Sequence, residues 1–162
     1  LARDVVGRVQ KLRKAAGLEV ADLVDVFVGE TGDDAITKAL ATPEQAEVVK
    51  TKLRCNVAGI GLLKPWMPHL APADEGAVHN SSLTVAITRP AITLVDDAVA
   101  DDFSFVPVDI VGQLVGSFDQ VKLKAASPNS IKLKVDAQTI NLVLGKHFYW
   151  SASDAVAAGL KA

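Results

Sequence analysis

The first 28 residues, LARDVVGRVQKLRKAAGLEVADLVDVFV (1–28), predict a helix that ends at a glycine and leads into a strand. At 100° per residue, apolar side chains gather on one arc of this helix: Val5, Val6, Val9, Leu12 and Ala16. Cations gather on the opposite arc: Arg3, Arg8, Lys11 and Lys14. Arg13 lies at the edge of the apolar arc, so we expect its guanidinium to emerge beside the packing surface. Gly17 can adopt the left-handed conformation that ends a helix, and residues 23–28 then form a strand.

Composition limits the classes of protein to which the chain can belong. With 162 residues, of which 49% are hydrophobic, it can build one mid-sized domain or two small ones. A net charge of -2 argues against a dedicated nucleic-acid domain, which is usually basic. The charge alternates along the chain, however: residues 1–17 hold 5 Lys/Arg and 1 Asp, and residues 48–65 hold 4 Lys/Arg and no acid. A polyanion would therefore meet only particular faces, chiefly the first helix.

Three features concern the cellular setting. Cys55 is the single cysteine, which excludes an internal disulfide and indicates a reducing, cytoplasmic compartment. No apolar run of about 18 residues could cross a membrane, so no membrane partner is expected. The chain begins at Leu1 and enters a helix at once, so we expect a piece of a longer polypeptide.

Further elements follow in the first half. Residues 35–40 are weakly helical, and Thr42-Pro43-Glu44-Gln45 has the pattern of a capping box that starts a helix ending near residue 55 or 56. Residues 58–81 are rich in glycine and proline, which predicts a long connection. Trp66 and Met67 within it either cover an edge of the core or belong to a loop that docks a partner or faces tRNA.

The second half alternates short strands with turns. We expect strands at 82–88 and 92–95, and then at 119–125, 131–135 and 140–144. Residues 96–102, DDAVADD, are read as a solvated boundary, which divides the chain into units 1–97 and 98–162. A short helix over 151–158 is capped by Ser151. Four lysines then share one face of adjacent strands, either merely solvated or contacting tRNA or a partner: Lys122, Lys124, Lys132 and Lys134.

The sequence supplies no catalytic constellation. It has no Gly-rich phosphate loop and no Gly-x-Ser-x-Gly turn. His69, His79 and His147 are too scattered for a zinc site, and the acidic stretch at 96–102 lacks a calcium-loop pattern, so no metal is predicted. His147 is expected to pack with a satisfied ring nitrogen. Cys55 is expected to be structural, the alternative being a pKa lowered by Arg54.

The amino-terminal segment resembles the start of the C-terminal region of isoleucyl-tRNA synthetases, patterned LAREVVxRIQxLRKxxGLxxTDxV. The matching residues are Leu1, Ala2, Arg3, Val5, Val6, Arg8, Gln10, Leu12, Arg13, Lys14, Gly17, Leu18, Asp22 and Val24. Asp4 and Val9 are conservative replacements, whereas Ala21 and Leu23 depart from the pattern. The match is dense over about 25 residues and then fades, and the tail lacks the cysteine pairs of many bacterial members.

The resemblance implies a fold and a function. The fold is α+β: a helix and strand junction domain, 1–97, follows the anticodon-binding bundle, and an appended β-rich module with a short helix, 98–162, resembles the ubiquitin-like tails of eukaryotic cytoplasmic members. The implied enzyme joins isoleucine to its tRNA with ATP and Mg²⁺ bound elsewhere, so this piece has no cofactor and no catalytic residue. It would support tRNA binding, through Arg13 and the eight cations named above. The alternative is a module that docks the enzyme, through Trp66 and Met67, to other synthetases or a second subunit.

Overall fold

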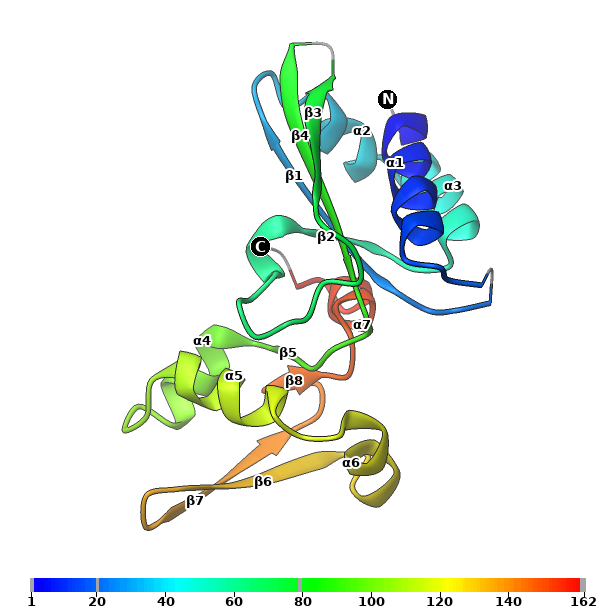
Figure 1. The fold of residues 1–162 in the computed structure, drawn as a ribbon. Coiled ribbons are helices and arrows are strands. Elements are labelled where there is room, and N and C mark those ends of the chain that lie inside the picture. The colour runs from blue at the N-terminus through cyan, green and yellow to red at the C-terminus, as the bar shows by residue number, and fades with distance from the viewer. Residues whose placement is uncertain (1, 20, 79, 161–162) are drawn as a thin grey trace.

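The computed structural model describes residues 2–19, 21–78 and 80–160, so Leu1 and His79 lie outside the described residues. It confirms a mixed α+β chain (Figure 1). The central sheet has four strands in the order β2-β1-β4-β3, formed by Val57–Gly59, Asp25–Thr31, Ser81–Thr88 and Asp74–Val78. β1 pairs antiparallel with β4 and parallel with β2. No helix in the described ranges is long and apolar enough to cross a membrane.

Three helices pack on one face of this sheet: α1 (Ala2–Ala15), α2 (Ala35–Ala41) and α3 (Pro43–Leu53). The predicted apolar arc of α1 is confirmed, since Val5 and Val9 are fully buried. Gly17 has φ 71°, as predicted for the residue that ends this helix. α3 ends earlier than expected because Arg54 adopts a left-handed conformation with φ 61°. The Thr42 hydroxyl does not cap α3 and instead donates to the Ala39 carbonyl at 2.8 Å.

A second core lies in the other half of the chain. It is built on two small sheets, β5 (Thr93–Leu94) with β8 (Phe148–Tyr149) and β6 (Ser130–Val135) with β7 (Gln138–Val143). Helices α4 (Asp96–Asp102) and α5 (Val108–Gly116) contribute buried valines to it. Phe148 is fully buried and meets Trp150 edge to face, with 5.1 Å between ring centroids. The hairpin predicted between the strands at 131–135 and 140–144 is confirmed.

Several predicted elements are wrong. Residues 119–125 form helix α6 (Gln120–Ala126) in place of a strand, because Asp119 caps it by accepting the Lys122 N–H and most of its residues favour helix. Residues 96–102 form α4, where aspartates at the amino end suit the helix dipole and Val99 is buried. The expected connection 58–81 contains the 3₁₀ turn η1 (Ile60–Leu62) and β3, an edge strand without a run of apolar residues.

The last helix, α7 (Ala152–Ala157), returns to the first sheet (Figure 1). Its Ser151 cap is confirmed, since the hydroxyl accepts the Asp154 N–H at 3.0 Å. Asp25 of β1 accepts the N–H groups of Ala152 and Ser153, and Asn56 is hydrogen-bonded to Ser153. Residues beyond 98 thus contribute to both halves, and the division at 97/98 stays a prediction.

Candidate nucleic-acid interface

The cations of α1 fall into an exposed set and a set engaged inside the protein. Arg3, Lys11 and Lys14 are exposed, as the helical pattern predicted. Arg8 is half-buried and its Nη1 lies 2.9 Å from Asp74 Oδ2 on β3. This ion pair neutralises one member of the predicted cationic arc.

Arg13 is the clearest correction. Its side chain does not emerge, because the residue is only 8% exposed and its Nη2 donates to the carbonyls of Glu19 and Asp22 at 3.0 and 2.8 Å. These bonds hold the turn between α1 and β1, which contains Gly17. A buried guanidinium satisfied by carbonyls is a structural group. Arg13 is therefore engaged in the turn, although the residue also lines a surface hollow together with Lys14.

The four lysines of the second half do not share one sheet face. Lys122 and Lys124 are on helix α6, whereas Lys132 and Lys134 alternate outward on β6. Lys124 Nζ lies 6.0 Å from the centroid of the Trp150 ring, which engages it in a cation-π contact. The predicted cluster of four on one sheet is wrong, and two separate pairs take its place.

The structure reveals another cationic group, which sequence reasoning had not named. Lys52 and Arg54, at the carboxyl end of α3, line a hollow of about 270 Å³ together with Lys14 of α1. Lys50 is exposed in the same last turn of α3. We call Lys14, Lys52 and Arg54 the α1–α3 cationic group. The signal was present in the charge count of residues 48–65, but the packing of α3 against α1 was needed to join it to the first helix.

The charge of the α1–α3 cationic group suits anions, and its residues also have a structural role. Cations in the last turn of a helix complement its negative end, a contribution of a few tenths of a kcal/mol to about 1 kcal/mol each. Glu19 also lines the hollow and provides a single opposing charge. Besides the buried Arg13, three exposed cations surround this depression, which suits phosphate oxygens that position a nucleic acid without reading its sequence.

Trp66 and Met67 cover an edge of the core, which was one of the two roles expected for them. Met67 is 3% exposed, and Trp66 is half-buried against Gly112 and Gly116 of α5. Any docking role of these two side chains stays a prediction.

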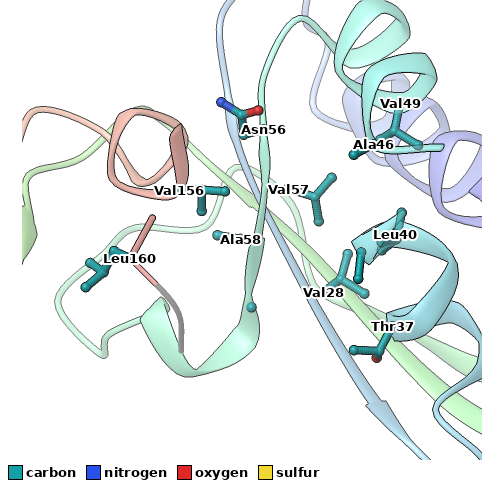
Figure 2. A pocket seen from close by; sticks show the side chains of 12 residues that line it. Val28, Thr37, Leu40, Ala46, Val49, Asn56, Val57, Ala58, Val156 and Leu160 are labelled. Carbon is teal, nitrogen blue, oxygen red and sulfur yellow. The ribbon is translucent and has the colours of Figure 1, made fainter. Parts of the chain in front are cut away.

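An apolar hollow of about 320 Å³ lies beside β2, between α2 and α3 on one side and α7 on the other (Figure 2). Val28, Val57 and Leu160 are among the residues that line it, and none of the described residues in its lining is charged. Its polar side chains are already engaged, Thr37 with Glu30 and Asn56 with Ser153.

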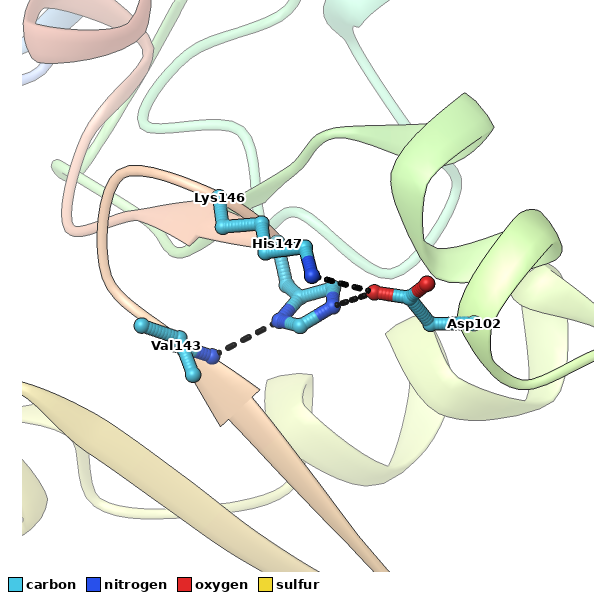
Figure 3. A network of polar contacts seen from close by, with 4 residues as sticks. All are labelled: Asp102, Val143, Lys146 and His147. Atoms are coloured by element: carbon cyan, nitrogen blue, oxygen red, sulfur yellow. Dashed lines mark hydrogen bonds and ion pairs between the residues drawn. The ribbon is translucent and has the colours of Figure 1, made fainter.

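His147 is buried in a polar network and cannot act as a general base (Figure 3). Its Nδ1 accepts the Val143 N–H at 2.9 Å, which requires that nitrogen to be unprotonated. The neutral ring consequently carries its proton on Nε2 and donates to Asp102 Oδ2 at 2.7 Å. Lys146 Nζ lies 3.0 Å from the same oxygen. Both ring nitrogens are used, as expected for a packing histidine.

This network predicts a response to acid. The hydrogen bond from His147, together with that from Lys146, lowers the pKa of Asp102. Because an unfolded aspartate titrates near pH 4, the stabilisation is complete above that pH and is lost as pH falls through the lower pKa of the folded state. We expect the urea midpoint to fall less steeply below about pH 4 in Asp102→Asn than in the parent chain. Asp101→Asn, at the exposed neighbouring position, should keep the parent slope, and an unchanged slope in Asp102→Asn would contradict the prediction.

Cys55 is structural, as expected. Burial raises the pKa of its thiol to about 11, which is opposite to the lowered pKa of the alternative, a thiolate activated by Arg54. Within the described ranges, no three His, Cys, Asp or Glu side chains are grouped so as to hold a metal ion.

Comparison with known proteins adds one resemblance. No family model matches the chain. The chain is similar to a protein of Arabidopsis thaliana described as cytoplasmic isoleucine–tRNA ligase, with 26% identity over 174 aligned residues. The alignment covers 94% of this chain and 14% of the relative, so the likeness extends well beyond the amino-terminal segment. It suggests a fragment of that synthetase family.

Proposed function

We propose that this chain is a non-catalytic C-terminal part of a cytoplasmic isoleucine–tRNA ligase and that it supports the binding of tRNA-Ile. The observation that carries the tRNA role is the α1–α3 cationic group. The likeness to the Arabidopsis protein supports the family. In this proposal ATP and Mg²⁺ act in the remainder of the enzyme, which this chain does not span.

The geometry favours contact with the RNA backbone. Lys14, Lys52 and Arg54 have side chains that donate hydrogen bonds and accept none, which suits phosphate oxygens. Aromatic residues make up only 5% of the chain, so extensive stacking on bases is not expected. The contacts therefore fix the position of the tRNA and leave recognition of its sequence to other parts of the enzyme.

A charge-reversal experiment tests the proposal. The chain is titrated with fluorescent tRNA-Ile at several salt concentrations, and Lys14→Glu/Arg54→Glu is compared with the parent. We expect binding to weaken by about tenfold or more and the salt slope to fall by about 1.4 to 1.8, since each of the two phosphate contacts contributes roughly 0.7 to 0.9.

The matched control is Lys132→Glu/Lys134→Glu, which makes the same change in net charge on the exposed face of β6. We expect this variant to bind tRNA within about twofold of the parent, because salt screens long-range electrostatic effects of the β6 charges. Equal weakening by both variants, or no binding by the parent at low salt, would argue against the α1–α3 cationic group as an RNA surface. Circular dichroism of each variant confirms that helix content is unchanged.

The alternative function is protein docking, to other synthetases or to a second subunit. Exposed apolar side chains at and before the first turn of α5 favour it: Phe105 is 50% exposed and Ile110 is 41% exposed. Sedimentation equilibrium separates the alternatives, because a dimer that is lost in Ile110→Glu would support docking to a second subunit.

A further inference from the structure

A hollow of about 490 Å³ lies away from the α1–α3 cationic group. It is formed by the segment 66–68, the segment 89–92, the end of α5 and the start of α6. Its walls are mainly apolar and include Trp66, Met67, Ile92 and Phe118. Its volume is within the range of pockets that bind small molecules, which are typically apolar with a few polar groups.

The polar side chains of this hollow are donors. Of the described residues that line it, Arg89 alone is charged, and none is Asp or Glu. Among the described residues, the Arg89 side chain has no ion pair or hydrogen bond, and the residue is exposed. The oxygen of Gln120 accepts the Ile92 N–H at 3.1 Å, which leaves the amide NH₂ of that side chain to donate to a ligand.

We propose that this hollow binds a small amphipathic carboxylate, whose apolar body lies against Trp66 and Phe118 and whose carboxylate pairs with Arg89. The charge complementarity is specific to an anion, because the only charged group and the available amide are both donors. A neutral apolar ligand would leave the guanidinium without a partner. In the apolar hollow beside β2, the described lining includes no charged side chain that would give such a preference.

Exposed apolar side chains at the edge of the hollow extend its apolar surface. Leu23 is 64% exposed and Val121 is 80% exposed, and both line the same hollow. A ligand whose apolar body extends beyond the hollow could cover part of these two side chains. The inference is independent of the proposed tRNA role, since it uses other residues and another ligand.

Decanoate is the probe, and 1-decanol is its uncharged counterpart. Binding is followed by the indole N–H resonances of Trp66, which lines the hollow, and of Trp150, which does not. We expect decanoate to shift the Trp66 resonance saturably with a Kd of about 1 mM or lower. Arg89→Ala should weaken decanoate binding about tenfold and leave decanol binding unchanged.

Two substitutions at the exposed Val121 provide a second test that does not depend on Arg89. Val121→Glu places an anion beside the hollow and should weaken decanoate binding several-fold more than Val121→Gln, which has nearly the same shape. Arg3→Ala, which removes an exposed cation on α1, should bind as the parent does. The proposal is overturned if the parent shows no saturable shift, or if Arg89→Ala binds decanoate as tightly as the parent. Equal weakening of decanoate and decanol in Arg89→Ala would also overturn it.

Discussion

Replacing Asp25 with alanine should lower the free energy of unfolding by about 3 kcal/mol and the midpoint of thermal unfolding by about 6–12 °C. Asp25 is 1% exposed and joins three segments. Its Oδ2 accepts the N–H groups of Ala91 at 3.2 Å and Ala152 at 2.8 Å, and its Oδ1 accepts that of Ser153 at 3.2 Å. Alanine would leave these donors without the acceptor that ties α7 to the central sheet. Urea and thermal unfolding measure the loss.

The charge on Asp25 makes asparagine an informative control. Burial raises the pKa of Asp25, although the three N–H groups oppose that shift. The pKa of Asp25 is thus higher in the folded state than in the unfolded state. The protein therefore loses stability as the pH rises from the unfolded pKa through the folded pKa, and at neutral pH the ionised carboxylate lowers the free energy of unfolding. Asp25→Asn removes this cost and keeps an oxygen for Ala91 and Ala152. The amide NH₂ then faces the Ser153 N–H, which loses its acceptor. We expect Asp25→Asn to lose less than half of what Asp25→Ala loses, and equal losses would show that the charge or the bond from Ser153 is required.

The sequence correctly predicted those helices and strands in which the spacing of apolar residues agrees with the residues that begin or end the element. The amphipathic spacing of α1, the proline that starts α3 and the serine cap of α7 each specify a local conformation through contacts within a few residues. The strand β4 forms where expected and ends before Pro90, but its alternation holds only in the first half, because residues 85–88 are buried on both faces of the sheet. These features do not depend on what the rest of the chain does.

The errors arise where distant contacts decide. In residues 120–126, polar and apolar side chains alternate as they do in a strand. In the structure, however, Val121 is exposed and Leu123 is only half-buried, and the Asp119 side chain caps this segment as a helix. Arg13 seemed to be a surface cation, because the carbonyls of Glu19 and Asp22 approach it only after the turn has folded. Lys52 and Arg54 join Lys14 through helix packing, which no local pattern records.

Gly112→Ala should lower the free energy of unfolding by about 1–3 kcal/mol, although alanine favours helix over glycine by about 1 kcal/mol. A Cβ at this position would overlap the indole ring of Trp66, and one at Gly116 would lie 2.9 Å from Trp66 Cδ1. α5 thus accepts the indole on a face made of glycines. The methyl group must displace the ring, which also covers an edge of the core, so the Trp66 fluorescence should shift to longer wavelength as the unfolding midpoint falls.

Gly7→Ala provides the matched control because it makes the same change in a helix where nothing lies within 4 Å of the added Cβ. There the helix propensity acts alone, and we expect the free energy of unfolding to rise by about 0.5–1 kcal/mol. Opposite signs for the two substitutions would separate the contact with Trp66 from the backbone effect of glycine. If Gly112→Ala is stabilising and leaves the Trp66 fluorescence unchanged, the ring does not lie on α5. Trp66 would then not form the wall of the 490 Å³ hollow in the way described above.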